Sequence, residues 1–157
     1  MSLIEIERKY LVKNTDFKAF AKSKIEIQQG YLNSDPARTV RVRTYGEENF
    51  LTIKGKSNAT GTTRFEWEKP VERTEAKALL EICEKGVIQK NRYLVPAGKH
   101  TFEVDEFFGE NEGLIIAEIE LNDEHETFEK PDWLGEEVTG DSRYYNSQLS
   151  QKPYTSW

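Results

Sequence analysis

Three charged residues near the N-terminus share one parity of the chain. Glu5, Glu7 and Lys9 alternate with the apolar residues Ile4 and Ile6. Because successive residues of a β-strand face opposite sides of the sheet, one face of such a strand carries two carboxylates and an ammonium group. A sheet with several rows of this kind could close around a highly charged ligand and its metal ions.

The same arrangement recurs on most later strands, with charges of both signs. Taking one parity for each strand, the bases are Lys9, Arg41, Arg43, Lys54, Lys56, Arg64, Lys90 and Arg92, and the acids are Glu5, Glu7, Glu66, Glu68, Glu103, Asp105, Glu118 and Glu120. One interpretation is the solvated face of a one-sided antiparallel sheet. Two observations oppose it: Arg and Glu dominate the rows, and like charges cluster on single strands, which is tolerated best where opposite charge lies between them.

Rows of acids and bases suit phosphate chemistry. Arginine and lysine donate charge-assisted hydrogen bonds to phosphoryl oxygens. Carboxylates repel phosphate, but they bind Mg²⁺ or Mn²⁺, which bridge protein acids to phosphates. A cation held in this way neutralises developing charge and orients water for in-line attack. The pattern is therefore what metal-dependent hydrolysis of a polyphosphate requires.

The charged rows lie on segments that alternate with a period of two. We predict strands at 3–12, 25–33, 38–46, 49–57, 62–71, 87–95, 100–107 and 114–122. Most connections are too short for parallel crossovers, so the sheet should be mainly antiparallel, and eight such strands can close into a barrel. In the first strand, Arg8 has the opposite parity to its charged neighbours and should point away from the shared face.

Helical periodicity predicts three helices. The first covers 15–23 and presents Phe17, Phe20 and Ala21 on one side. The second covers 74–85 and is expected to bury Ala78, Leu79, Ile82 and Cys83. The third covers 141–150, with Asp141 as its N-cap. For this last helix, a position at the end of the barrel and a position outside it are both left open.

Composition narrows the class of protein. The 157 residues suit a single domain, 1–157, and the net charge of −6 argues against non-specific nucleic-acid binding. No signal-peptide core and no run of about 18 apolar residues is present, so we expect a cytoplasmic protein without a membrane partner. A single cysteine, Cys83, excludes an intrachain disulfide and a zinc-thiolate cluster.

The motif Glu5-x-Glu7-x-Lys9 resembles that of the CYTH, or triphosphate tunnel metalloenzyme, superfamily. Later matches follow in order: Val40-Arg41-Val42-Arg43, Leu51-Thr52-Ile53-Lys54-Gly55, Arg64-Phe65-Glu66-Trp67-Glu68, Lys90-x-Arg92, Glu103-x-Asp105 and Glu118-Ile119-Glu120. The resemblance covers about residues 3–122. It implies a mainly β fold, an eight-stranded antiparallel closed barrel with a charged tunnel and a few short helices outside it or at its mouth.

The resemblance also implies roles for the charged residues. The bases that would bind the triphosphate are Lys9, Arg41, Arg43, Lys54, Arg64, Lys90 and Arg92. The metal ligands, for Mg²⁺ or Mn²⁺, would be Glu5, Glu7, Glu118 and Glu120, with Glu103 and Asp105 beside them. Glu103, Asp105, Glu66 and Glu68 would complete the metal shell, orient the bases or position water. The catalytic group would comprise Glu5, Glu7, Lys9, Glu66 and Glu68.

The implied reaction is hydrolysis of inorganic triphosphate to pyrophosphate and phosphate. The opening Ile-Glu-Arg-Lys-Tyr-Leu-Val and the aromatic Tyr31 are similar to those of small bacterial members with this activity. Alternatives are a class IV-type adenylate cyclase, a nucleoside or thiamine triphosphatase, and a non-catalytic module that binds polyphosphate. The expected partner is the small-molecule triphosphate, and a homodimer is left open.

Overall fold

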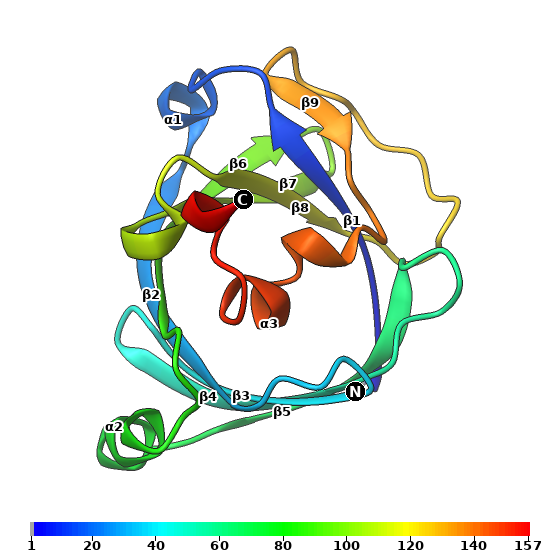
Figure 1. Cartoon of the computed structure of the whole chain (residues 1–157). Helices are drawn as coiled ribbons and strands as arrows, with labels where there is room; N and C mark the ends of the chain where they lie inside the picture. Colours follow the sequence, from blue (N-terminus) through cyan, green and yellow to red (C-terminus); the bar gives the residue numbers. More distant parts are fainter. Residues whose placement is uncertain (1) are drawn as a thin grey trace.

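The computed structural model describes residues 2–157 and contains a closed barrel of antiparallel strands (Figure 1). The strands are β1 (Ile4–Val12), β2 (Ser23–Asn33), β3 (Arg38–Tyr45), β4 (Glu48–Gly55), β5 (Thr63–Pro70), β6 (Ile88–Ala97), β7 (His100–Phe107), β8 (Ile115–Glu120) and β9 (Leu134–Glu137). The helices are α1 (Phe17–Phe20), α2 (Arg73–Glu81) and α3 (Asn146–Leu149), with 3-10 turns η1 (Gly109–Asn111), η2 (Ser142–Tyr144) and η3 (Tyr154–Ser156). The eight predicted strands are confirmed, with differences only at their ends.

The barrel closes on β1. The strand order is β5-β4-β3-β2-β6-β7-β8-β1-β9, with a further pairing between β5 and β1. One edge of β1 pairs with β8, whereas the other pairs first with β5 through Ile4–Ile6 and then with β9 through Tyr10 and Val12. Between these two partners, the backbone N–H of Glu7 donates to the carbonyl of Thr62 at 3.0 Å. We call this change of partner the β1 seam.

Strand β9 lies outside the set of predicted strands. Its four residues include Gly135 and give no stretch of alternation long enough to detect. A Cβ atom at Gly135 would lie 2.9 Å from the carbonyl oxygen of Leu11, so glycine is required for β9 to approach β1 this closely.

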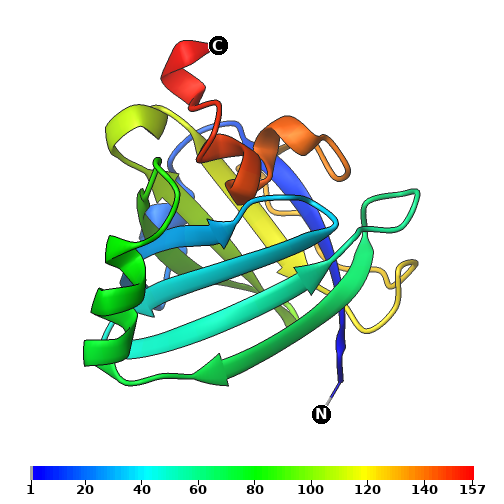
Figure 2. The same cartoon turned by 60° about the horizontal axis from the view of Figure 1, so that its bottom comes forward.

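The buried face of α2 differs from the predicted one. Ala76 is buried and Leu79, Leu80 and Cys83 are half-buried, whereas Ala78 is exposed and Ile82 is 70% exposed. Ala78 and Ile82 were therefore predicted wrongly. A reciprocal capping box between Glu72 and Glu75 begins the helix at Arg73 and thereby sets its rotation. The apolar residues at i, i+3, i+4 and i+7 are then Ala76, Leu79, Leu80 and Cys83. This side of α2 packs on the outer face of β2–β4 (Figure 2).

The other two predicted helices are shorter than expected. Helix α1 is a single turn that buries Phe17 and leaves Phe20 66% exposed. The predicted 141–150 helix is divided by Tyr145, whose φ of −69° and ψ of 133° are extended, into η2 and α3. Asp141 caps the first piece as predicted, its side chain accepting from the backbone N–H of Arg143 at 3.1 Å. In residues 2–157, no helix has the length and apolar character that a bilayer crossing needs.

The larger hydrophobic core lies outside the barrel. Phe17, Phe102 and Trp133 meet there edge to face, with ring centroids 5.4–5.8 Å apart. Around them pack Tyr10, Val95, Ala97, Val104, Ala117, Ile119, Leu121 and Leu134. This core covers the outer face of β6, β7, β8 and β1, so the apolar parity of these strands is buried without using the barrel interior.

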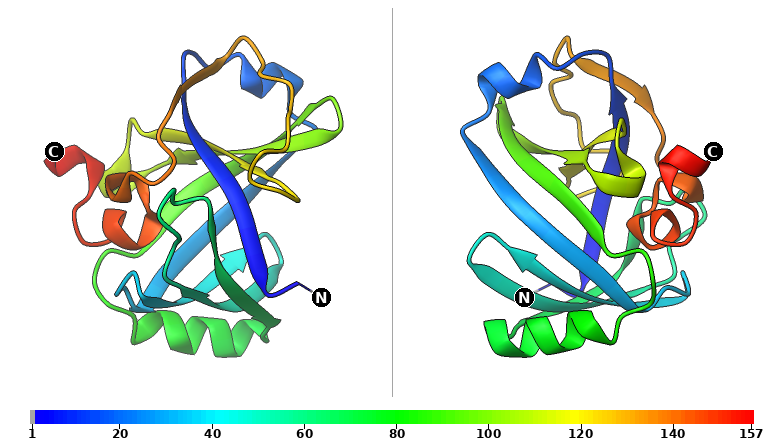
Figure 3. Two further views of the ribbon diagram at one scale, coloured as in Figure 1. Left: turned by 90° about the vertical axis from the view of Figure 1, so that its right-hand side faces the viewer. Right: turned by 60° about the vertical axis from the view of Figure 1, so that its left-hand side comes forward.

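A second apolar cluster closes one end of the barrel from inside. Ile88, Phe107, Leu114 and Ile116 pack there against Val138, Tyr144 and Leu149. The first four share the inward parity of the charged residues on their strands. Residues 138–157, which we call the C-terminal segment, therefore sit at one mouth of the barrel (Figure 3), and α3 lies within the ring of strands in the end-on view of Figure 1.

Candidate active site

The predicted charged face lines the interior of the barrel. A cavity of about 310 Å³ is bordered by every predicted site residue except Asp105, which lies behind it. Lys56 follows the end of β4 and is exposed, so it lies outside the cavity. Arg8 points outward as predicted, and its guanidinium donates to Glu137 at 2.8 Å. We call this space the tunnel cavity.

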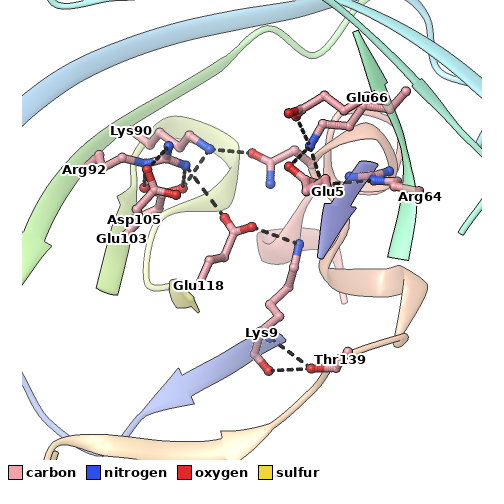
Figure 4. Close-up of polar contacts among 12 residues, drawn as sticks. Glu5, Lys9, Arg64, Glu66, Lys90, Arg92, Glu103, Asp105, Glu118 and Thr139 are labelled. Carbon is pink, nitrogen blue, oxygen red and sulfur yellow. Dashed lines mark hydrogen bonds and ion pairs between the residues drawn. The ribbon is translucent and has the colours of Figure 1, made fainter. Parts of the chain in front are cut away.

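Asp105 holds two of the bases in place (Figure 4). Its carboxylate accepts two hydrogen bonds from Arg92, at 2.8 and 3.0 Å, and lies 2.8 Å from Lys90 Nζ. All three side chains are almost completely buried. Burial opposes the charges of Arg92 and Lys90, but these charges prevail and lower the pKa of Asp105. Asp105 thus orients bases and is not among the clustered carboxylates described next.

Glu5 is the centre of an acidic group at the junction of β1 and β5. Its carboxylate lies 2.9 Å from Lys54 Nζ and 3.5 Å from Arg64 Nε. Burial raises the pKa of Glu5, but Lys54 and Arg64 outweigh burial and lower it to about 2. Glu66 lies 3.4 Å from Lys54, and burial together with the charge of Glu5 raises its pKa to about 7.

Carboxylate oxygens of Glu5, Glu66 and Glu120 lie within 4.8 Å of one another. Opposite ligands of an octahedral Mg²⁺ are about 4.2 Å apart, because each bond is about 2.1 Å long. Burial and the charge of Glu5 raise the pKa of Glu120, so a bound cation there would favour its ionised form. The donor set and its spacing fit a hard divalent cation.

A second acidic pair lies deeper in the tunnel. Glu118 is 3.9 Å from Lys9 Nζ and 3.7 Å from Arg92, and these bases lower its pKa well below the usual value against the effect of burial. Glu7 on β1, which lies opposite Glu120 and one inward position from Lys9, the cross-strand partner of Glu118, has no ion-pair partner within 4.0 Å among residues 2–157. Burial and the charges of Glu118 and Glu5 raise the pKa of Glu7 well above its usual value.

The bases of β3 leave donors free for an anion. Glu68 lies 3.7 Å from both Arg41 and Arg43 and accepts from Thr52 Oγ1 at 2.7 Å. The Nε–H groups of Arg41 and Arg43 are buried and find no acceptor among the described residues. Burial and the charge of Arg41 lower the pKa of Arg43 to about 10, so bound negative charge there would relieve repulsion.

Of the two positions left open for the 141–150 helix, the structure shows the one at the end of the barrel, and the C-terminal segment supplies three lining residues. Tyr145, Asn146 and Ser147 border the cavity, beside the expected aromatic Tyr31. The ring of Tyr145 lies 5.4 Å from Lys9 Nζ and 5.8 Å from the Arg64 guanidinium carbon. At this end of the barrel, the inward-facing residues of the strands change from charged to apolar, at Ile88, Phe107 and Ile116. This change in the sequence could have predicted that an apolar segment enters the barrel there.

Comparison with known proteins finds similarity over nearly the whole chain. A family model described as the CYTH domain matches residues 3–153. An inorganic triphosphatase of Acetivibrio thermocellus is 49% identical over 154 residues, which are 98% of this chain and 97% of that protein. One from Nitrosomonas europaea is 35% identical over 94% and 97% of the two chains. A solved structure of an inorganic triphosphatase is 33% identical, with a TM-score of 0.64 over 93% of this chain and 97% of that one.

Proposed function

Because the chain belongs to the CYTH domain family, we propose that it is a divalent-metal-dependent triphosphatase that hydrolyses inorganic triphosphate to pyrophosphate and phosphate. The observation that supports this most directly is the pairing of a three-carboxylate cluster with buried arginine donors that lack acceptors in one cavity. The first suits a hard cation, and the second suits phosphoryl oxygens.

In this proposal, Glu5, Glu66 and Glu120 hold a Mg²⁺ or Mn²⁺ ion. When bound, the ion would neutralise charge on the phosphoryl oxygens and lower the pKa of a coordinated water. Glu118 and Glu103 keep Arg92 in position, at 3.7 and 3.0 Å, and Asp105 does the same for Lys90. The roles that the family resemblance assigned to Glu118, Glu103 and Asp105 as metal ligands are therefore proposed here as roles in orienting bases.

The bases bind the phosphate chain and stabilise the leaving group. Arg41 and Arg43 present unpaired Nε–H donors to it, and Lys9, Lys54, Arg64, Lys90 and Arg92 surround the rest of the cavity. Water attacks the terminal phosphorus, a new P–O bond forms, and the bridging P–O bond breaks with its electrons on pyrophosphate. Glu7 is proposed to take the proton of the water, since it borders the cavity and has no ion-pair partner among residues 2–157 to occupy its carboxylate.

Phosphate release tests the proposal directly. A malachite-green assay with Mg²⁺ or Mn²⁺ should show turnover of inorganic triphosphate above that of ATP, thiamine triphosphate and pyrophosphate. Cyclic AMP formed from ATP would instead identify a cyclase, and tight triphosphate binding without turnover would identify a binding module.

Glu5→Gln should abolish this turnover while the circular-dichroism spectrum stays that of the folded barrel. Glutamine preserves the shape of Glu5 but removes the charge of the clustered carboxylate that would hold the cation. A near-normal rate in this variant would remove Glu5 from the mechanism.

A further inference from the structure

Asn146 is held at the closed end of the tunnel by two donors. Its Oδ1 accepts from Gln29 Nε2 at 2.9 Å and from Lys90 Nζ at 2.8 Å. Gln29 is fully buried and the Lys90 side chain is 2% exposed, so neither donor is free to move. An amide oxygen has two lone pairs, and both are used here. These contacts fix the orientation of the Asn146 amide group, with Oδ1 directed toward Gln29 and Lys90.

The opposite side of the Asn146 amide faces the cavity. Asn146 is one of its lining residues, and its Nδ2 group donates to no acceptor within residues 2–157. An amide nitrogen carries two N–H donors, and both are available to a ligand. Nothing in the charge pattern of the first 122 residues indicates this group, because it comes from the C-terminal segment.

Charge and exposure change along the tunnel. At the closed end, Lys9, Arg64 and Lys90 surround Tyr145 and Asn146. At the other end, the side chains of Glu66, Glu68 and Glu103 keep 27%, 33% and 34% of their surface exposed, against 7% for Lys9 and 2% for Lys90. Solvent therefore reaches the cavity from the end at Glu66, Glu68 and Glu103, and the end that α3 closes is buried.

We propose that Asn146 Nδ2 donates to the terminal phosphoryl group of the substrate, so that the tunnel binds a phosphate chain by an unesterified end. This inference rests on the proposed function and specifies its substrate class: linear phosphate chains with at least one free end. A chain esterified at both ends cannot place a terminal phosphoryl group against the closed wall, which Tyr145, Asn146 and Ser147 form.

Asn146→Asp separates this role from a structural one. Aspartate keeps an oxygen that accepts from Gln29 and Lys90, so the anchoring of α3 is preserved and the melting temperature should not fall. It replaces the Nδ2 donor by a carboxylate oxygen that repels phosphate. With Mg²⁺ and inorganic triphosphate, we expect KM to rise about tenfold or more, the usual effect of losing a hydrogen bond to a charged group, with a smaller change in kcat.

Gln148→Glu is the matched control. It adds the same charge to the same helix but does not border the cavity, and KM should stay within about twofold of the wild type. If Asn146 only anchors the segment and does not contact bound triphosphate, the KM of Asn146→Asp will match that of Gln148→Glu, and the inference is refuted. A wild-type chain without turnover would contradict the proposed function instead, and titration calorimetry of triphosphate binding would then test Asn146 through Kd.

A second measurement needs no variant. ATP has one free phosphate end, whereas diadenosine triphosphate has none. As inhibitors of triphosphate hydrolysis by the wild-type protein, ATP should compete and diadenosine triphosphate should be at least about tenfold weaker, because it cannot make the charge-assisted hydrogen bond at the closed wall. Equal inhibition by the two compounds, or inhibition by neither, would contradict recognition of a free chain end.

Discussion

Replacing Glu66 with glutamine should stabilise the metal-free protein above neutral pH. Glu66 faces Glu5 across the β1–β5 junction, and burial together with that neighbour raises its pKa to about 7. A carboxyl group whose pKa is higher in the folded state favours folding at low pH, and this contribution is lost as the pH rises through the folded-state pKa. Ionised Glu66 therefore opposes folding at pH 8.

The size of the effect follows from the raised pKa. A pKa that rises from 4.5 to about 7 corresponds to about 3 kcal/mol of folding free energy once the group is ionised. Glutamine resembles the protonated carboxyl group and removes this cost, and the favourable contact with Lys54 at 3.4 Å is already included in the raised pKa. The net gain at pH 8 should thus be about 3 kcal/mol, and at pH 4 it should vanish.

Urea denaturation in EDTA at pH 4 and pH 8 measures both values. Glu26→Gln is the control, since it removes the same charge from an exposed position on β2 and should change neither. Saturating Mg²⁺ should reverse the order of stability at pH 8, because the wild type keeps the full carboxylate cluster. Equal destabilisation of Glu66→Gln at both pH values would refute the reasoning, since it would mean that the carboxylate is not repelled in the fold.

Two further substitutions test the structure. Asp105→Asn should lower the free energy of unfolding by about 3–5 kcal/mol in urea titration, because it leaves buried Arg92 and Lys90 without their shared carboxylate; a loss below about 1 kcal/mol would contradict this. Gly61→Ala should lower the free energy of unfolding by about 3 kcal/mol, since the φ of Gly61 is +76° and a Cβ atom there would lie 2.3 Å from the Cα of Gly140. Gly109→Ala, with φ of +64° and open space, is its control and should cost about 1 kcal/mol; equal losses in the two variants would show that the close contact is unimportant.

The barrel and its charged lining could be predicted because alternation is a local property. The inward direction of Glu5, Glu7 and Lys9, and the outward direction of Arg8, follow from parity alone. The pairing of Lys9 with Glu118 joins strands far apart in the chain, and only the closed sheet brings these residues together. The alternation within single strands therefore could not predict which acids cluster and which ones orient bases. Glu66 lies in the carboxylate cluster, whereas Asp105 contacts Lys90 and Arg92.

The parts that were missed depend on long-range packing. Strand β9 is defined by its approach to β1 and not by its four residues. The position of the helix that carries Asn146 was left open, and its place in the tunnel depends on Tyr144 and Leu149 filling the apolar end of the barrel. The buried face of α2 differs from the predicted one because the capping box between Glu72 and Glu75 determines where that helix begins, and neither glutamate belongs to the apolar pattern.

The pairing of β1 has a consequence for how the chain is made. Strand β1 is synthesised before all of its partners, β5, β8 and β9, and the last of these ends at Glu137. The neighbouring strands β2–β4 and β6–β7 can form hairpins as they emerge, whereas the strand with the Glu5-x-Glu7-x-Lys9 motif completes its pairing only after β8, more than two thirds along the chain. Strand β1 is thus among the last to be fully paired, and the carboxylate cluster of Glu5, Glu66 and Glu120 cannot assemble before β8 is in place.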